Sequence, residues 1–440
     1  ARRLGTNSGS AVVFDCHTGE MLAMASMPAY DPNSFSAGIS HLEWEMLSAN
    51  DHVPLMNKAT QGLYPPGSTV KPMNGLALLE AGVSPHERVV CTGALRVGSG
   101  VFHCHKRGGH GALDLGGAIA ASCDIYFYEM VRRLGYDNVA PIARMLGMGE
   151  KFDLPLTTQR YGTVPDSAWK LRKYKSRWTV ADSLNASIGQ GYVLVNPLQL
   201  AVMSARIASG RMLQPSLLAD HVSRNPAALP VKPENLQIVR EGMWRVVNGG
   251  GTGGAARMLV PGIQLAAKTG TAQVRRITMA ERRSGVLKNA QLPFKLRDHA
   301  LFVCFAPIEN PRYAAAIVLE HNGHTVRNLD TPMIGRDIMT YLFDRDRAMK
   351  SLAEVEPTWG GDIRTRMAAE SAAYRAAANA HPSEEGMATE TDAPAPTDAP
   401  AVEAVTSASN ASADATPGDI ANTGGVAGTT GSPEPGPQER

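Results

Sequence analysis

Ser68 and Lys71 have the types and the spacing of a nucleophile and its base. They stand three residues apart in the stretch 62–72, directly after a Pro-Pro-Gly sequence. Prolines forbid a helix before this point and serine is a favoured helix N-cap, so we expect a helix to begin at or next to Ser68. Residues at i and i+3 share one helix face. Because a lysine that loses its proton can activate a neighbouring serine, the pair predicts nucleophilic catalysis.

A serine three residues before a lysine also arises by chance, and the chain contains a second instance at Ser167 and Lys170. That second pair opens a stretch, 170–177, that is rich in Lys and Arg. We interpret this stretch as a solvated, charged face of the protein. The assignment of Ser68 therefore depends on motifs elsewhere in the chain.

If Ser68 is a nucleophile, the chemistry also requires a second proton shuttle and groups that hold an anionic substrate. Ser122 and Asp124 follow an apolar stretch at 112–121, where we expect the edge of a helix. A second motif, at the end of an expected strand, consists of Lys268, Thr269, Gly270 and Thr271. A glycine beside a strand end lets the backbone of a substrate approach closely. These two motifs can supply the missing functions.

The pattern of apolar residues predicts an α+β fold. A β-hairpin is expected at 9–27, whereas further strands are expected only towards the far end of the chain, at 263–267, 300–306 and 313–320. Helical periodicity dominates between them, at 113–134, 137–147, 196–209 and 235–247. Strands so distant in sequence must close on one sheet, and the helices between them form a lobe. A loop is expected at 272–296 and an outlying helix at 361–380.

Composition divides the chain into parts of different character. With 440 residues, 43% of them hydrophobic, the chain can bury a large core. The net charge of +2 conceals an asymmetry, because residues 383–440 hold ten acidic groups and one basic group, which leaves +11 on the rest. We predict a folded domain at 1–345, a helical extension at 346–382, and a disordered acidic tail at 383–440. The basic part is compatible with a polyanionic surface, membrane headgroups or an anionic substrate.

In this order, the three motifs resemble the active-site motifs of penicillin-binding proteins and serine β-lactamases. The similarity covers about 9–345 and is most like class B penicillin-binding proteins, on the segments 19–24, 28–33, 187–191 and 305–307. The sequence Ser-Cys-Asp at the second motif, followed by Ile-Tyr-Phe-Tyr, resembles the elongation branch, penicillin-binding protein 2. The resemblance implies a penicillin-binding protein transpeptidase or serine β-lactamase-like fold, an antiparallel sheet flanked by helices with an inserted helical lobe.

The resemblance also implies a role for each motif, in a D,D-transpeptidase that cross-links peptidoglycan stem peptides during cell elongation. Ser68 attacks the penultimate D-Ala carbonyl to form an acyl-enzyme, and Lys71 takes its proton. Ser122 relays a proton to the departing D-Ala, and Asp124, which should ionise beside Lys71, orients the lysine or the substrate amide. The motif at 268–271 binds the terminal carboxylate. The backbone N–H groups of Ser68 and of the last residue of that motif form the oxyanion hole, and β-lactams acylate Ser68 in the same way.

A cluster of soft ligands lies in a glycine-rich stretch and consists of Cys91, Cys104, His110 and Cys123. Three thiolates and one imidazole form a ligand set for tetrahedral structural zinc. Elongation-type relatives resemble the chain here, with a zinc site built partly from aspartates. A disulfide between Cys91 and Cys104, or buried unpaired thiols, are the alternatives. Zinc on Cys123 would position the catalytic motif without taking part in the chemistry, and His103 and His105 are expected at the surface.

Other functions on the same fold remain open, namely a β-lactam-hydrolysing enzyme or carboxypeptidase and a β-lactam-sensing domain. No glutamate that could activate a deacylating water is identified. The chain has no apolar run of the roughly 18 residues that a membrane span needs, and its start without Met predicts a missing upstream anchor. The resemblance therefore implies the periplasmic face of a bacterial inner membrane. It implies as partners peptidoglycan stem peptides, β-lactam antibiotics, a membrane glycosyltransferase and elongation scaffold proteins, without nucleic acid and without a catalytic cofactor.

Overall fold

A five-stranded antiparallel sheet forms the centre of the computed structural model, in the order β2-β1-β9-β8-β7. The model describes residues 1–36, 38–218, 221–222, 225–275, 281, 285–322 and 330–380. The strands of the sheet are β1 (Gly9–Asp15), β2 (Met21–Met27), β7 (Ala266–Ala272), β8 (His299–Ala306) and β9 (Tyr313–Leu319). The hairpin β1–β2 pairs through β9 with strands from the far end of the domain, which confirms the prediction of one sheet closed by distant segments.

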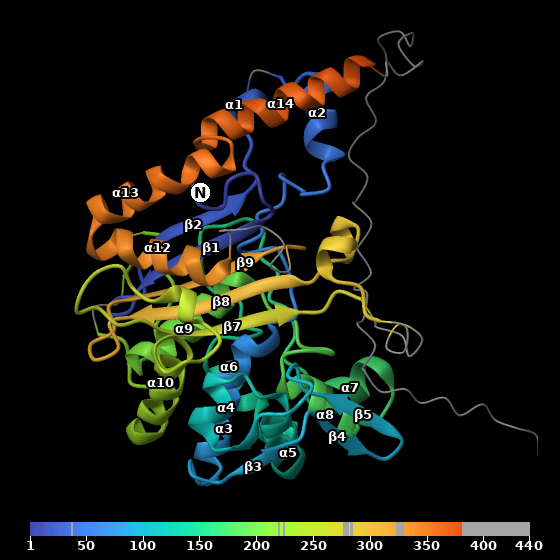
Figure 1. Ribbon diagram of the computed structural model, residues 1–440, viewed down its shortest axis with the longest axis vertical. Coiled ribbons are helices and arrows are strands. Elements are labelled where there is room, and N and C mark those ends of the chain that lie inside the picture. Colours follow the sequence, from blue (N-terminus) through green and yellow to red (C-terminus); the bar gives the residue numbers. More distant parts are fainter. Residues whose placement is uncertain are drawn as a thin grey trace, which may run out of the picture.

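Helices cover both faces of this sheet (Figure 1). All eight residues of β8 are buried, so each face of the strand needs a packing partner. Helix α9 (Pro197–Ser209) packs on β1, β8 and β9, and helix α12 (Thr331–Phe343) packs on β8 and β9 from the other side. The ends of α9 follow the sequence, because Asn196 and Gln199 form a capping box at its start and Gly210 closes it in a left-handed conformation.

The inserted lobe is mainly helical, as predicted. Its helices are α3 (Lys71–Glu80), α4 (Leu115–Ala120), α5 (Asp124–Leu134), α6 (Ala140–Met145), α7 (Ser167–Tyr174), α8 (Val180–Ser187) and α10 (Pro233–Asn248). It also contains two ribbons that the sequence analysis did not predict: β3 (Val89–Cys91) with β6 (Gly111–Leu113), and β4 (Ala94–Val97) with β5 (Gly100–His103). These ribbons frame the segment that contains the cysteine cluster.

Two predicted boundaries were wrong at the motifs. The helix expected at 113–134 is broken between α4 and α5, because Ser122 has a left-handed φ of 55° that no helix interior accepts. The strand expected at 263–267 instead spans Ala266–Ala272, so the Lys-Thr-Gly-Thr motif lies inside β7 and not after it. Continuous pairing with β8, from Ala266 to Ala272, outweighs the poor strand propensity of the glycine.

The C-terminal part of the described chain is helical and packs against the N-terminus. The expected helix at 361–380 is confirmed as α14 (Ile363–Ala380), which follows α13 (Arg345–Val355). Arg366 donates to the backbone oxygen of Arg2 at 2.8 Å, and Arg2 pairs with Glu356 at 2.7 Å. The predicted disordered tail and part of the predicted loop at 272–296 lie outside the described residues.

The remaining short elements are α1 (Asn33–Ser36), α2 (His41–Ser48), η1 (Gly67–Val70), η2 (Tyr136–Asn138), η4 (Gly254–Ala256), η5 (Asn289–Gln291), η6 (Phe294–Leu296) and η7 (Glu356–Trp359). Within the described ranges, none of the helices combines the length and the apolar character that a bilayer crossing requires.

Candidate active site

Ser68 lies in η1, a single 3-10 turn that leads directly into α3. The predicted helix start is confirmed, but the predicted capping role of the serine is wrong. The residue in the N-cap position of the turn is Pro66, and no side chain caps it. The Ser68 side chain is half-buried and is not used as a cap, which leaves its hydroxyl available for chemistry.

Three backbone segments meet at this turn with no room for side chains between them. Gly67 has a φ of 54°, and a Cβ there would lie 2.4 Å from the backbone oxygen of Thr271 in β7. Gly189 approaches from the other side, and its Cβ would lie 2.3 Å from the Gly67 oxygen. The Gly67 N–H donates to the Gly189 oxygen at 2.9 Å. The nucleophile is therefore fixed by backbone packing between β7 and the segment 187–191.

Lys71 is completely buried and points towards the Ser-x-Asp motif. Its Nζ donates to the Ser122 backbone oxygen at 2.7 Å, to the Ser122 Oγ at 3.3 Å and to the Asp124 Oδ1 at 2.6 Å. The Lys71 backbone N–H donates to the Ser68 carbonyl oxygen, but among the described residues the partners of the Lys71 Nζ do not include the Ser68 hydroxyl. Hydrogen bonds between catalytic groups often tighten only when substrate is bound.

Asp124 shares its two carboxylate oxygens between two cations. Oδ1 accepts from Lys71, and Oδ2 accepts from the backbone N–H of His105 at 2.9 Å and lies 3.7 Å from the His105 ring nitrogen. Burial alone would raise the pKa of Asp124, but Lys71 and His105 outweigh it and hold that pKa well below its usual range. This direction agrees with the expectation that Asp124 ionises beside Lys71.

His105, which was expected at the surface, contacts the carboxylate of Asp124. Its side chain is 50% exposed, yet its hydrogen bond with Asp124 raises the pKa of its imidazole to about 9. No short sequence motif connects residues 105 and 124, because the contact depends on how the β4–β5 ribbon folds against α5. The alternation of histidine, cysteine and histidine at 103–105 was the available signal.

The motif in β7 divides into buried and accessible residues. Lys268 is completely buried, and burial lowers its pKa well below the ordinary value, an effect that the nearby Lys71 charge strengthens and Asp124 opposes. Thr269 is half-buried and Thr271 is exposed, so these two residues can touch a bound carboxylate directly. The Lys268 Nζ donates to the backbone oxygen of Thr269 at 3.0 Å, and a direct contact of this lysine with the carboxylate stays a prediction.

Gly270 was expected to let the backbone of a substrate approach closely, and this expectation was also wrong. A Cβ at this position would lie 2.7 Å from the Thr69 side chain and 3.2 Å from the Pro66 oxygen. The missing side chain therefore makes room for the turn that holds Ser68, and not for the backbone of a substrate.

Thr252 joins the site although the sequence analysis did not identify it. Its hydroxyl lies 2.6 Å from the hydroxyl of Thr269, and its backbone N–H donates to the oxygen of Ala120 at 3.2 Å. The residue thus connects β7 with the end of α4, directly before the Ser-x-Asp motif. A run of glycines at 249–254, interrupted only by this threonine, was the signal in the sequence.

The four predicted metal ligands converge in the structure. The ligand atoms of Cys91, Cys104, His110 and Cys123 all lie within 4.8 Å of one another. The Cys91 and Cys104 sulfurs lie 3.6 and 3.5 Å from the His110 Nδ1. Both cysteines are free, so the alternative of a disulfide between them is not realised. The hydrogen bond between Cys104 and Cys123 lowers the pKa of the Cys104 thiol and raises that of Cys123, so Cys104 is the one of the two that is favoured as a thiolate.

The second Ser-x-x-Lys pair does not form a catalytic site. Ser167 opens α7 and donates to Asp137 at 2.5 Å, and Lys170 pairs with Asp182 at 2.6 Å. Lys170 is buried, so the prediction that this residue belongs to a solvated face was wrong at this position.

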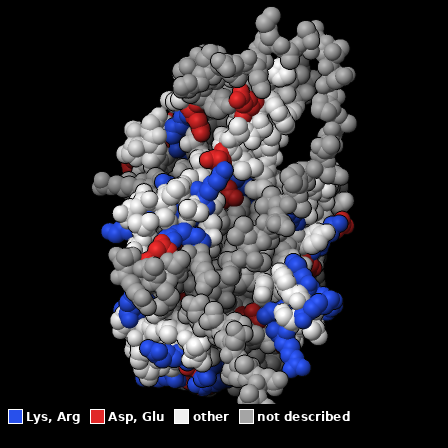
Figure 2. Space-filling view, turned by 90° about the vertical axis from the view of Figure 1, so that its right-hand side faces the viewer, with Lys and Arg blue, Asp and Glu red and all other residues white. Residues whose placement is uncertain are grey.

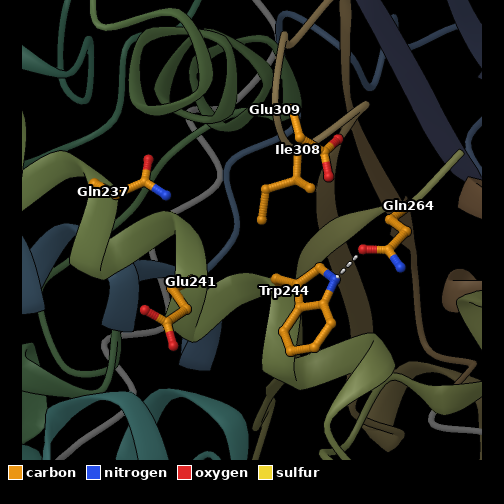
Figure 3. A pocket seen from close by; sticks show the side chains of 6 residues that line it. All are labelled: Gln237, Glu241, Trp244, Gln264, Ile308 and Glu309. Carbon is orange, nitrogen blue, oxygen red and sulfur yellow. Dashed lines mark hydrogen bonds between the residues drawn. The ribbon is translucent and has the colours of Figure 1, made fainter.

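A pocket of about 290 Å³ lies between α10, the start of β7 and the turn after β8 (Figure 3). Its lining residues are Gln237, Glu241, Trp244, Gln264, Ile308 and Glu309. A hydrogen bond of 2.7 Å from the Trp244 Nε1 to Gln264 closes one side. None of the motif residues lines this pocket, so it is separate from the candidate active site.

Comparison with known proteins agrees with this geometry. The family model for the penicillin binding protein transpeptidase domain matches residues 9–340. A peptidoglycan D,D-transpeptidase MrdA from Salmonella typhimurium is 34% identical over 358 residues, which are 78% of this chain and 56% of the relative. The MrdA of Acinetobacter baumannii is 35% identical over 338 residues, covering 74% of this chain and 49% of the relative. The chain thus spans about half the length of these curated relatives.

Solved structures show the same fold. PBP2 of Helicobacter pylori in complex with MreC has a TM-score of 0.68 and 31% identity, covering 78% of this chain and 62% of that one. PBP2 of Pseudomonas aeruginosa in complex with WCK 5153 has a TM-score of 0.64 and 32% identity, covering 78% of this chain and 74% of that one. With its three motifs brought together on this fold and matched over most of the described residues, the chain belongs to the penicillin binding protein transpeptidase family.

Proposed function

We propose that this protein is a D,D-transpeptidase that cross-links peptidoglycan stem peptides during cell elongation and is a target of β-lactams. The observation that carries the proposal is the buried network of Lys71, Ser122 and Asp124, which lies directly beside the turn of Ser68. A serine with a buried amine, a second hydroxyl and an adjacent threonine-lined strand has the groups needed for acyl transfer to and from a peptide with a free carboxylate.

The reaction follows from the positions of these groups. The Ser68 hydroxyl attacks the penultimate D-Ala carbonyl, which forms the ester bond and breaks the bond to the terminal D-Ala. Its proton passes to Lys71 as the Lys71 ammonium gives one of its own protons to Ser122. Ser122, within 3.3 Å of the Lys71 Nζ, returns a proton to the leaving amine. The amine of a second stem peptide then attacks the ester, which releases Ser68 and forms the cross-link. Backbone N–H groups of Ser68 and Thr271 stabilise the oxyanion in both steps, and losing such a donor typically costs about a hundredfold in rate.

Incubation with a labelled penicillin distinguishes this function from the alternatives on the same fold. We expect rapid labelling, slow release, and loss of the label in Ser68→Ala. Rapid release would instead indicate a β-lactam-hydrolysing enzyme or carboxypeptidase. Formation of cross-linked product from glycan strands with intact stem peptides then separates a transpeptidase from a sensor. The variant Ser122→Ala should block cross-linking, whereas a sensor would not need this hydroxyl.

We propose in addition that Cys91, Cys104, His110 and Cys123 hold a structural zinc ion. Zinc bonds of about 2.3 Å to sulfur and about 2.0 Å to nitrogen, at tetrahedral angles, place sulfur and nitrogen about 3.5 Å apart. The sulfur-to-nitrogen distances of 3.6 and 3.5 Å in this cluster fit that value. The ion would supply no chemistry in the reaction. Its effect would be to hold the backbone between Ser122 and Asp124.

Metal analysis of the purified chain tests this second proposal. We expect close to one zinc per chain, and a loss of zinc together with a lower melting temperature in Cys91→Ser. Cys304→Ser is the matched control, because Cys304 is an equally buried free cysteine in β8 that is not part of the cluster. Absence of zinc from the unaltered protein, with Cys91→Ser as stable as the parent, would exclude the metal.

The setting of the enzyme forms the last part of the proposal. We place the catalytic domain at 1–345, with 346–382 as a helical extension, on the periplasmic face of the inner membrane. A membrane glycosyltransferase and elongation scaffold proteins are its proposed partners. The relatives support this assignment, since one structure holds PBP2 with MreC and another describes a peptidoglycan synthase complex that couples polymerization and crosslinking. Co-purification of the full-length protein with such a glycosyltransferase tests it.

A further inference from the structure

Helix α7 and the residues that follow it form a cationic surface with aromatic rings at its base. Residues 171–177 are all exposed, and the charged ones are Arg172, Lys173, Lys175 and Arg177. The acids nearby are already engaged, since Asp166 pairs with Arg144 at 2.5 Å and Asp182 pairs with Lys170 at 2.6 Å. In the part of the chain that the structure describes, none of the four exposed cations forms an ion pair.

Three aromatic side chains form the base of this surface. Trp169, Tyr174 and Tyr192 contact one another with ring centroids 5.3 to 5.6 Å apart. The Lys173 Nζ lies 5.2 Å from the Trp169 ring centroid and 5.5 Å from that of Tyr174, so this cation is held over the rings. Tyr174 is 39% exposed and offers part of its ring to solvent. The surface thus presents both positive charge and aromatic faces.

This surface is continuous with the candidate active site. Tyr192 lies two residues after Gln190 in the chain. The side-chain amide nitrogen of Gln190 lies 3.4 Å from the backbone oxygen of Thr271. Gly189 in the same segment packs on the turn of Ser68. Figure 2 looks at the side of the molecule on which α7 lies in Figure 1, and it shows blue Lys and Arg side chains gathered over its lower half. A polymer that reaches Ser68 along this side would cross α7.

We propose that the surface of Trp169, Tyr174, Tyr192 and the cations at 172–177 docks a peptidoglycan strand through its stem-peptide carboxylates and its sugars. The proposal rests on the transpeptidase function proposed above. Stem-peptide carboxylates complement the four unpaired cations, and a sugar ring packs on the exposed part of Tyr174. Anionic lipid would use the charges, but it would not account for the aromatic rings or for the continuity with the candidate active site.

The test compares polymer binding with acylation in the full chain. The α7 variant replaces Arg172, Lys173, Lys175 and Arg177 by Ser, and the matched control replaces Arg345, Arg347 and Lys350, three exposed cations on α13, by Ser. We expect the ratio of sacculus affinity to penicillin acylation rate to fall about tenfold in the α7 variant, since each exposed charge pair contributes up to about 1 kcal/mol. The control should keep the parental ratio.

The probes are purified sacculi, glycan strands stripped of stem peptides, and phosphatidylglycerol vesicles. The proposal predicts that stripped strands bind more weakly than intact sacculi and that added salt weakens binding of the parent more than that of the α7 variant. An unchanged ratio in the α7 variant, equal binding of stripped strands, or an effect confined to vesicles would each overturn it. Acylation of Ser68 by penicillin in the parent decides the transpeptidase proposal separately, because penicillin is too small to reach α7.

Discussion

The two halves of the active site are held in place by different physical means. The half in β7 is an edge strand of a buried five-stranded sheet, and backbone packing against Gly67 positions it. The half at the start of α5 has no such sheet behind it. The Lys71 side chain and the backbone N–H of His105 hold Ser122 and Asp124 instead, next to the cysteine cluster that includes Cys123. The first half should therefore be sensitive to added volume, and the second to the loss of a charge or a ligand.

Added volume at the sheet half should have the largest effect. In Gly67→Ala the new Cβ would collide with the Thr271 oxygen at 2.4 Å on a backbone with a φ of 54°. Overpacking and left-handed strain together predict a loss of about 4 kcal/mol in the free energy of unfolding and a loss of about a hundredfold in acylation. Penicillin labelling kinetics and thermal unfolding measure both quantities.

Gly82→Ala is the matched control for this variant. Gly82 also has a positive φ, of 86°, but its added Cβ would meet nothing within 4 Å. We expect only the strain cost of about 1 kcal/mol and normal acylation. Equal damage from both variants would show that backbone conformation, and not close packing on β7, positions the nucleophile.

In the half that contains Ser122 and Asp124, the largest effect should come from removing the charge of Asp124. Asp124→Asn leaves the Lys71 ammonium buried without its carboxylate partner at 2.6 Å. Removing one partner of a buried ion pair costs about 3 kcal/mol or more, so chemical denaturation should show a loss of this size. A change below about 0.5 kcal/mol, the range of ordinary surface substitutions, would mean that the pair is not needed to hold the motif.

Thr252 bridges the two halves, so its hydroxyl should have an intermediate effect. Thr252→Val removes the hydrogen bond to Thr269 at 2.6 Å and keeps the shape of the side chain. One hydrogen bond of this kind contributes about 1 kcal/mol, which predicts about a fivefold lower acylation efficiency and an unchanged melting temperature. Thr252→Ser should restore the efficiency. If serine fails to rescue, the hydroxyl is not the group that matters.

At neutral pH the smallest effect is expected from a buried histidine of the sheet half, which makes stability depend on pH below about 6.5. His299 opens β8 and accepts a hydrogen bond from the backbone N–H of His321 at 3.0 Å. Burial, with a smaller contribution from the charge of His321, lowers the pKa of His299 to about 3. The unfolded chain has a histidine pKa of about 6.5, so below that pH the unfolded state binds the proton more readily.

This histidine therefore contributes stability above about pH 6.5 that is lost as the pH falls towards its folded value, by at most about 1.4 kcal/mol per pH unit. His299→Gln should make the unfolding free energy less dependent on pH between about 6.5 and 4. His86→Gln, at an exposed histidine, is the control. Parallel pH profiles of parent and His299→Gln would contradict the assignment.

Residue patterns within short segments were sufficient to predict most of the central strands and the main helices of this protein. The hairpin at 9–27, the strands that became β8 and β9, and the helix expected at 196–209, which is α9, were all confirmed. The three motifs and the cluster of Cys91, Cys104, His110 and Cys123 were also found in sequence and converge in space. Each of these features is encoded by residues that are close in sequence or rare in type.

Features that depend on tertiary approach were not predicted. A helix edge was expected near Ser122, but the left-handed conformation of this residue was not, and the helical periodicity at 113–134 runs across it. Gly270 was explained by substrate because the sequence does not show that Thr69 packs against it. His105 and Thr252 reach their partners over long stretches of chain. The sequence was therefore sufficient to find the motif in β7 but not to show how it packs. For the motif of Ser122 and Asp124, the contact with His105 was found only in the structure.

The most direct test of the account is the identity of the acylated residue. After incubation with penicillin, mass spectrometry of the digested protein should find the adduct on Ser68 in the parent and in Ser167→Ala, and on no residue in Ser68→Ala. An adduct on Ser167, on any other residue, or no adduct in the parent would contradict the assignment of the nucleophile and with it the proposed reaction.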